Sequence, residues 1–388
     1  RDVAPSRGLG DVYKRQKVYW TRHFDRYELF RSDPADWYTG HNYHETEVFG
    51  ANLNATTQWK LGRTSMGVEF RNEGVRSNVL GKPMKEPQDV PFEKEGQYLK
   101  SDNRSNISYF LEHNVLLRRF TLSVGVLANY NSALNEGIHF YPGIDASYRI
   151  GDNFRLYGSW NRALRMPTFT DLYYEGKTNK GNPDLKPEES EAFEVGLKYN
   201  TYFLRAHIAG FYRKGKNMID WVKEKPEDIW ESQNLTKVDN LGFETNLSLL
   251  PRELGNERFF IRKIELGYAF IHQDKDSEGY ISNYALDYLK HKFTAQLSHS
   301  IWKGFSATWY VRWQDRAGSY TKYENLKPAY EEPYAPYCLV DMKVNWEYQR
   351  LNLYAELNNL LNSTYYDLGN IPQPGIWFKA GFRYSFKY

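Results

Sequence analysis

The stretch IWFKAGFRYSFKY, residues 376–388, alternates apolar and polar side chains along its whole length. Apolar or aromatic side chains occupy every second position: Ile376, Phe378, Ala380, Phe382, Tyr384, Phe386 and Tyr388. A period of two places such residues on one face of a β-strand. The 13 residues of this segment exceed the roughly 5–6 of an average globular strand. They reach the roughly 9–11 residues that a membrane-crossing strand requires.

The same alternation recurs at 154–161, 293–300, 305–314 and 351–358. A water-facing apolar band beside a polar band is costly in a soluble sheet, but it fits a barrel with lipid outside and water inside. Polar residues at every second position also explain the mean hydropathy of -0.73. We therefore predict an all-β protein, an antiparallel transmembrane β-barrel.

Connections between the predicted strands alternate between short and long. Short ones fall at 60–62, 116–119, 200–202, 302–304 and 347–350, and long ones at 32–42, 73–103, 163–187, 214–233 and 315–333. This asymmetry is typical of outer-membrane barrels, and the pattern predicts about 16 strands. A soluble β-sandwich or propeller leaves the strand lengths and the loop asymmetry unexplained.

Composition narrows the function. The 388 residues carry a net charge of only +3, which does not favour nucleic acid as a partner. Cys338 is the single cysteine, so an internal disulfide framework is excluded. The first segment, RDVAPSRGLGDVYKRQ at 1–16, shows no alternation. We interpret 1–16 as a foreign or misassembled end and 17–388 as a partial barrel domain.

The connection after residue 161 has a particular composition. Pro167 fixes its own φ and disfavours helix at the preceding residue, so the strand must end there. Arg162 and Arg165 lie across the predicted hairpin from Glu188, Glu189 and Glu191. Arginine–carboxylate pairs at these positions would pin the loop to the wall, and we expect a structural role for the motif rather than direct ligand contact.

Two blocks of this chain resemble the barrel of TonB-dependent outer-membrane receptors, closest to the cobalamin and ferric-siderophore receptors. They are NRALRMPTFTDLYY with GNPDLKPEESEAFEVGLKY, at 161–174 and 181–199, and LNLYAELNNLLNSTYYDLGNIPQPGIWFKAGFRYSF at 351–386. The positions that match the family are Arg162, Arg165, Pro167, Asp171, Leu172, Tyr173, Gly181, Asn182, Pro183, Asp184, Leu185, Pro187, Glu188, Glu194, Asn358, Asn359, Leu360, Asn362, Tyr365 and Gly375.

The resemblance implies a 22-stranded barrel with a plugged lumen. About 16 strands would be present here, with the plug domain missing and two sheet edges unpaired. It implies an outer membrane of a Gram-negative bacterium, and import of a ferric siderophore, cobalamin or haem driven through the TonB complex, without catalysis or cofactor. The remaining partners would be membrane lipid and the barrel-assembly machinery. That machinery would read a terminal signal formed by Phe382, Tyr384, Phe386 and Tyr388.

Two other functions remain open. A complete 16-stranded diffusion porin fits the strand number, but it would begin with a signal peptide directly before its first strand. A barrel enzyme would need a Ser/His/Asp or Asp/His group at the rim, and histidine and serine are scattered here without such a motif.

Loop aromatics are the candidate ligand contacts because they give large contact area at low entropic cost. They are Tyr173, Tyr174, Trp221, Trp230, Tyr320 and Tyr323. An interfacial aromatic girdle is the alternative for those near strand ends. His41 and His44 in HNYHETE, and DKDSEG at 274–279, are interpreted as polar loop segments, so no metal site is predicted.

Overall fold

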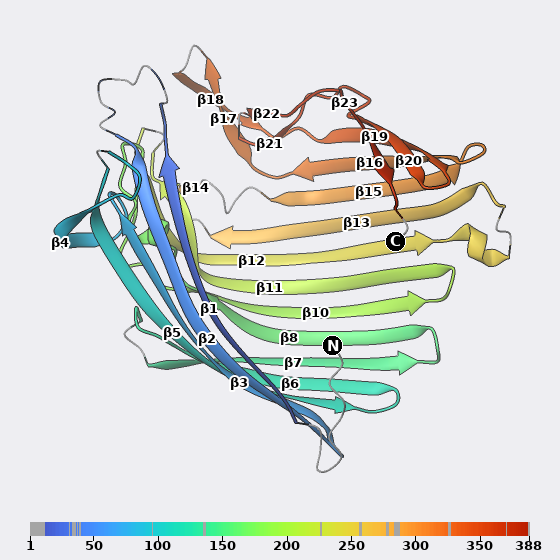
Figure 1. Ribbon diagram of the computed structural model, residues 1–388, viewed down its shortest axis with the longest axis horizontal. Helices are drawn as coiled ribbons and strands as arrows, with labels where there is room; N and C mark the ends of the chain where they lie inside the picture. The colour runs from blue at the N-terminus through green and yellow to red at the C-terminus, as the bar shows by residue number, and fades with distance from the viewer. Residues whose placement is uncertain are drawn as a thin grey trace.

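One curved antiparallel sheet dominates the computed structural model (Figure 1). The structure describes residues 12–30, 32, 36, 38, 40–94, 96–134, 137–225, 227–255, 258–276, 279–282, 288–324, 327–369 and 371–386. Within these ranges the main sheet has 19 strands, and sixteen remain when the short β4, β9 and β14 are set aside. The all-β class and the strand number predicted from the sequence are confirmed.

The sixteen long strands follow one another in chain order. They are β1 (Val12–Tyr27), β2 (Asn42–Trp59), β3 (Gly62–Ser77), β5 (Gln97–Leu116), β6 (Phe120–Asn131), β7 (Ile138–Ile150), β8 (Phe154–Arg165), β10 (Glu188–Asn200), β11 (Leu204–Lys223), β12 (Trp230–Leu249), β13 (Ile261–Asp276), β15 (Leu289–Ser300), β16 (Phe305–Arg316), β19 (Tyr337–Tyr348), β20 (Leu351–Asn358) and β23 (Trp377–Tyr384).

Short elements form within the connections between the long strands. They are β4 (Lys82–Asp89), α1 (Phe169–Tyr173), β9 (Asn179–Lys180), the 3-10 turn η1 (Pro251–Leu254), β14 (Ile281–Ser282), the hairpin of β17 (Ser319–Glu324) with β18 (Lys327–Pro333), and β21 (Tyr366–Leu368) with β22 (Ile371–Pro372). No helix in the described part of the chain is long and apolar enough to cross a membrane.

Each long strand pairs antiparallel with the next, from β1 with β2 to β20 with β23. Among the described residues β1 has no partner besides β2, and β23 none besides β20. The sheet is therefore open at two edges, as expected, and nothing resembling a plug fills it in the ranges given above. The predicted short turns are present: β2 ends at Trp59 and β3 begins at Gly62.

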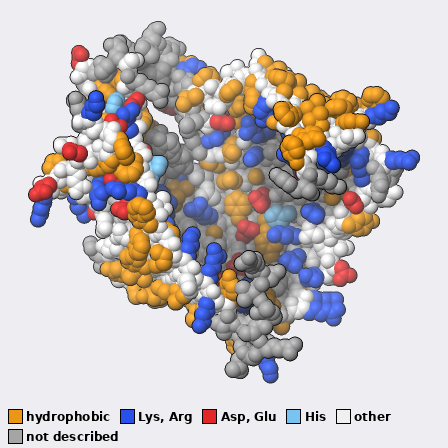
Figure 2. Space-filling view, in the orientation of Figure 1, with side chains coloured by type: hydrophobic (Ala, Val, Ile, Leu, Met, Phe, Trp, Pro, Cys, Tyr) orange, Lys and Arg blue, Asp and Glu red, His pale blue; other side chains and the backbone are white. Residues whose placement is uncertain are grey.

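The two faces of the sheet differ in polarity. Large apolar side chains such as Val18, Val195 and Leu241 are more than half exposed, which fits a surface that meets lipid rather than water. Figure 2 shows the hollow enclosed by the curved sheet, and its wall carries Lys, Arg, Asp and Glu side chains. The polar face is thus the inner one, as the alternation predicted.

The strands are longer at their long-loop ends than the sequence indicated. Most of the predicted loops 73–103 and 214–233 is strand, because β3, β5, β11 and β12 extend into them and β4 forms within the first. The extension of β11 and β12 buries a small cluster of Val222, Leu235 and Val238. Apolar and polar residues follow one another without a period of two in the extensions of β11 and β12, so a search for alternation does not find them.

The ends of the chain also differ from expectation. β1 begins at Val12, five residues before Lys17, and Val12 pairs with Thr57. Residues 1–11 lie outside the described ranges, and the division of the chain into 1–16 and 17–388 stays a prediction. The predicted 13-residue strand at 376–388 contains only β23, which ends at Tyr384. Phe382 and Tyr384 lie in β23, Phe386 follows it, and Tyr388 is outside the described residues.

Aromatic rings lie over directly opposed glycines at five places in the sheet. The pairs are Tyr19 with Gly50, Phe110 with Gly67, Tyr157 with Gly196, Phe211 with Gly242 and Tyr354 with Gly381. A Cβ added at any of these glycines would lie under 3 Å from the ring atoms. Such pairs fix strand register, because the ring fills the space that the missing side chain leaves.

Replacing Gly196 with alanine is expected to lower the free energy of unfolding by about 1–3 kcal/mol. The new methyl would displace the Tyr157 ring, whose hydroxyl lies 2.7 Å from Glu194 Oε1 and 2.8 Å from His207 Nε2. Denaturant unfolding in detergent micelles would measure the change. Gly210→Ala is the control, because the nearest atom to its new Cβ is 3.9 Å away. An equal loss of stability in Gly196→Ala and Gly210→Ala would show that the position of the Tyr157 ring does not depend on Gly196.

Candidate functional site

The connection between β8 and β10 is a folded unit rather than an irregular loop. β8 ends at Arg165, just before Met166-Pro167, as predicted. The following residues form the one-turn helix α1, which the sequence did not suggest. A capping box explains it: Thr168 Oγ1 accepts from the Asp171 backbone N–H at 3.1 Å, and Asp171 accepts from the Thr168 N–H at 3.0 Å.

Gly181 permits the loop to close on this helix. Its N–H donates to the Tyr174 carbonyl at 2.6 Å, and the next N–H, of Asn182, donates to the Asp171 carbonyl at 2.9 Å. A Cβ at Gly181 would lie under 3 Å from the backbone of residues 172–174. Asn182 Oδ1 then accepts from the Asp184 N–H at 2.9 Å, an Asx-type turn. Leu185 is buried beyond it.

The predicted ion pairs of this motif are present. Glu188 is 6% exposed and accepts from Arg165 Nε at 2.6 Å and from its terminal nitrogen at 2.5 Å. Its carboxylate also accepts from the Ile219 N–H at 2.8 Å. Arg162 makes looser contacts, 3.5 Å to Glu189 and 3.4 Å to Glu191. The first pair is bidentate and its Glu188 carboxylate is buried, although Arg165 is half exposed. In the second group all three side chains are partly exposed.

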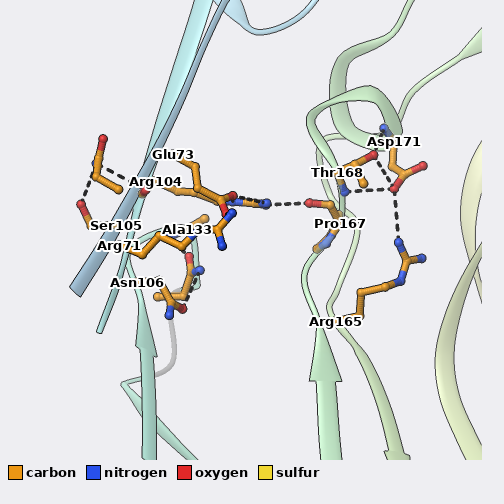
Figure 3. A network of polar contacts seen from close by, with 12 residues as sticks. Arg71, Glu73, Arg104, Ser105, Asn106, Ala133, Arg165, Pro167, Thr168 and Asp171 are labelled. Carbon is orange, nitrogen blue, oxygen red and sulfur yellow. Dashed lines mark hydrogen bonds and ion pairs between the residues drawn. The ribbon is translucent and has the colours of Figure 1, made fainter. Parts of the chain in front are cut away.

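Arg104 of β5 joins the loop to the facing part of the sheet (Figure 3). It donates from Nε and a terminal nitrogen to Glu73 of β3, at 3.0 and 2.8 Å, and from its other terminal nitrogen to the Pro167 carbonyl at 2.6 Å. Its guanidinium also lies 4.9 Å from the Phe169 ring centroid. Sequence reasoning missed Arg104 and Glu73, because their partners are distant in the chain.

Tyr173 makes a second link to β5. Its hydroxyl donates to Asp102 at 2.6 Å. Burial, and then the hydrogen bond to Asp102, raise the pKa of the Tyr173 phenol well above its usual value, so the hydroxyl stays protonated and donates. This candidate ligand contact therefore also holds the loop in place.

The loop is attached on its other side to β12. Asn234 accepts from the Lys186 N–H at 2.8 Å and donates to its carbonyl at 2.9 Å. The Trp230 N–H donates to the Thr178 carbonyl at 2.8 Å, and β9 pairs parallel with the start of β12. The segment between β8 and β10 thus spans from β5 to β12 and is held at both ends.

The candidate aromatic residues fall into separate groups. Trp221 lies in β11 and Trp230 begins β12, so neither is in a loop as expected. Tyr173 and Tyr174 lie in or directly after α1, beside the segment that pairs with Trp230. Lys223 lies 4.5 Å from the Trp230 ring centroid. These four positions share the region of the β8–β10 connection.

Tyr320 belongs elsewhere. It is 7% exposed and packs on Tyr366, 5.1 Å between ring centroids, and on Tyr334, 5.2 Å. Such burial favours packing of the β17–β18 hairpin over ligand contact. The side chain of Tyr323 lies outside the described residues.

The second motif block forms a compact turn after β20. Asn359, with φ of 51°, is 3% exposed. Its amide donates to the carbonyls of Ser363 and Pro374 and accepts from the Ser363 N–H. Asn362 accepts from the Ile376 N–H at 3.0 Å, directly before the last strand.

The remaining matched positions support this turn. The Leu360 N–H donates to the Val340 carbonyl at 2.8 Å, and Gly375 lies against the Asn362 side chain, which a Cβ would clash with. Tyr365 packs against Tyr337, with 4.6 Å between ring centroids and the rings tilted by 35°. Asn358, the last residue of β20, keeps an amide nitrogen without a partner among the described residues.

Metal chemistry receives no support from the clusters considered in the sequence. In the part of the chain that the structure describes, no group of three or more His, Cys, Asp or Glu side chains is placed to hold an ion. His41 contacts the Tyr38 hydroxyl and His44 the Ser77 hydroxyl, each at 2.8 Å, so the two rings serve different partners. The 274–279 segment lies partly outside the described ranges.

Residues 6–360 match the family model described as TonB dependent receptor-like, beta-barrel. The vitamin B12 transporter BtuB of Vibrio vulnificus is 26% identical in an alignment of length 225 that covers 44% of this chain and 36% of the relative. The ferrienterobactin receptor of Escherichia coli is 22% identical in an alignment of length 297 that covers 69% of this chain and 38% of the relative. The chain thus spans little more than a third of the length of these curated relatives.

A solved structure shares the fold. A mutant of the ferric enterobactin receptor PfeA from Pseudomonas aeruginosa superposes with a TM-score of 0.72 at 19% identity, covering 97% of this chain and 60% of that chain. At this identity the likeness concerns the fold alone.

Proposed function

Because the chain belongs to the TonB-dependent receptor-like β-barrel family, we propose that it forms part of the wall of an outer-membrane receptor. The receptor captures a scarce ligand outside the cell and imports it with energy delivered through TonB. Ligands of the relatives and neighbours named above include vitamin B12 and ferric enterobactin. The ligand of this receptor is then a ferric siderophore, cobalamin or haem, and no reaction is catalysed.

One observation beyond the family match carries this proposal. The β8–β10 connection crosses the long-loop end of the sheet, tied through Arg104 to β3 and β5 and through Asn234 to β12. A loop fixed in this way presents Tyr173 and Tyr174, beside Trp230 at the start of β12, from a rigid support rather than from a mobile tail. Rigid aromatic contacts suit high-affinity capture, because little entropy is lost on binding.

The proposed receptor also has a plug domain, a TonB-binding segment and further strands, none of which lies in the ranges that the structure describes. The plug would occupy the hollow, and the further strands would complete the two open edges. In the same proposal Phe382, Tyr384, Phe386 and Tyr388 form the signal read by the barrel-assembly machinery. A diffusion porin is the second candidate, and membership of the receptor family disfavours it.

Import measurements on the intact receptor, expressed from its full reading frame in cells that lack their own siderophore and cobalamin receptors, test the proposal. We expect accumulation of a radiolabelled ferric siderophore, cyanocobalamin or haem in cells with TonB, and at least about tenfold less without it. Equal uptake in both strains would instead indicate a passive pore. No uptake of any of the three above an empty-vector control would also contradict the proposal.

A further inference from the structure

The connections at the two ends of the sheet carry opposite charge. At one end, seven connections form what we call the short-turn rim: residues 60–61, 117–119, 151–153, 201–203, 250–260, 301–304 and 349–350. In the sequence this rim has seven Lys or Arg and three Asp or Glu, whereas the eight connections at the long-loop end have ten and twenty. The short-turn rim is therefore basic, and the opposite end of the sheet is acidic.

Basic side chains of the short-turn rim also lack the ion pairs found at the long-loop end. There Arg104 contacts Glu73 and Arg165 contacts Glu188. In the rim, no carboxylate from the described part of the chain lies within ion-pairing distance of Lys60, Arg118, Arg119, Lys303 or Arg350, and all five side chains are exposed. Their charge is therefore available to a partner outside the chain.

Large apolar side chains lie among these cations. Those more than half exposed within the rim are Leu61, Leu117, Tyr202, Leu254, Phe260, Ile301 and Trp302. Lys303 Nζ lies 5.1 Å from the ring centroid of the neighbouring Trp302, so apolar and cationic groups adjoin directly. Water makes such apolar exposure unfavourable, whereas the headgroup layer of a membrane accommodates aromatic and cationic side chains together. The composition of the rim thus fits immersion among lipid headgroups.

Aromatic pairs on the outer face place the rim at the same depth. Phe154 and Tyr199 are directly opposed, with 4.6 Å between ring centroids, and Phe305 and Trp346 are opposed at 6.0 Å. Phe154 and Phe305 each begin a strand directly after a rim connection. Aromatic girdles mark the level at which the hydrocarbon of a bilayer ends. The rim therefore begins where headgroups begin, and Figure 2 shows Lys and Arg side chains beside hydrophobic ones at this end.

We propose that the short-turn rim binds anionic phospholipid headgroups in preference to zwitterionic ones. Cations without carboxylate partners create a positive potential that attracts a net negative headgroup, whereas a zwitterionic headgroup brings its own cation. Because the long loops of outer-membrane barrels face the outside, these lipids belong to the periplasmic leaflet. An acidic protein would match the charge of the rim but would leave its exposed leucine and aromatic side chains without hydrocarbon.

This inference goes beyond the proposed function, because it requires the barrel to span a membrane but requires no imported ligand. Electron spin resonance tests it with spin-labelled phosphatidylglycerol and phosphatidylcholine, added to the intact receptor in phosphatidylcholine vesicles. We expect phosphatidylglycerol to associate at least about twofold more strongly with the receptor. The preference should decrease as salt is raised, because salt screens exposed charges.

Two combined variants locate the preference on the protein. The rim variant carries Lys60→Gln, Arg118→Gln, Arg119→Gln and Lys303→Gln, and it should lose most of the preference for phosphatidylglycerol. The matched control removes the same number of charges from exposed positions at the long-loop end, with Lys85→Gln, Lys94→Gln, Lys186→Gln and Lys225→Gln, and it should keep the preference. Both variants should unfold at the same denaturant concentration as the unaltered receptor, because exposed side chains contribute little to stability.

Equal association of the two lipids with the unaltered receptor would overturn the inference. A preference that persists in the rim variant, or that the control variant loses equally, would also overturn it, since the rim would then not be its source. Binding of soluble polyglutamate to the receptor in phosphatidylglycerol vesicles, if lost in the rim variant, would assign the rim to an acidic protein instead. None of these outcomes touches the proposed function, and a receptor that imports none of its three candidate ligands would leave the lipid result unchanged.

Discussion

Glu188→Ala is expected to lower the free energy of unfolding by about 2–3 kcal/mol and to release the β8–β10 connection. The carboxylate accepts two hydrogen bonds from Arg165 and one from the Ile219 N–H, and it is 6% exposed. Hydrogen bonds to charged groups contribute about 1.5–3 kcal/mol, and a buried N–H left without its acceptor adds a cost. The Arg165 side chain is half exposed, so water replaces part of the interaction that its guanidinium loses when the Glu188 carboxylate is removed.

Two measurements check this result. Denaturant unfolding in detergent micelles gives the stability, and limited proteolysis reports whether 166–187 becomes accessible. Glu189→Ala is the matched control, since within the described part of the chain that carboxylate makes only a 3.5 Å contact to Arg162. This variant should change stability by less than about 0.5 kcal/mol. Glu188→Gln keeps an acceptor for Ile219 and should fall between the two. If Glu188→Ala and Glu189→Ala behave alike, the buried pair does not anchor the loop.

The parts of this site that could be predicted from the sequence are those set by local geometry. Arg165 ends β8 and Glu188 begins β10, the two strands of one hairpin. Once both strands are predicted, the pairing of these two residues follows almost directly. Pro167 ends β8 because its ring fixes its own φ and restricts the residue before it, which needs no contact with distant residues. The alternation of lipid-facing and inner residues likewise needs no knowledge of distant segments, and it yielded the fold class and the strand number.

The parts that could not be predicted depend on curvature. Arg104 meets the Pro167 carbonyl because the sheet bends until β5 approaches the β8–β10 connection, and no period in the sequence reports that approach. Trp221 was assigned to a loop because apolar and polar residues follow one another without a period of two at the outer ends of β11 and β12. The burial of Tyr320 depends on Tyr366, which lies in another connection altogether. Each of these failed predictions concerns residues on the long-loop side of the lipid-facing band. There the alternation of apolar and polar residues no longer distinguishes strand from loop.

Asn359→Ala is expected to cost about 3 kcal/mol of stability, from two separable sources. The backbone φ of 51° lies in the left-handed region, where alanine is disfavoured by about 1–2 kcal/mol. The buried amide makes three hydrogen bonds, to the carbonyls of Ser363 and Pro374 and from the Ser363 N–H. Each contributes about 0.5–1.5 kcal/mol net. Their loss would free the connection that leads into β23.

Asn359→Gly separates the two sources. Glycine adopts the left-handed conformation readily, so this variant should lose the side-chain hydrogen bonds but avoid the backbone strain. We expect Asn359→Gly to be about 1 kcal/mol more stable than Asn359→Ala when both are unfolded by denaturant in micelles. Leu361→Ala, in the same turn but 58% exposed, is the control and should change little. If both Asn359 variants match it, the asparagine is dispensable to the turn. If they differ from it but not from each other, the hydrogen bonds alone hold the last hairpin together.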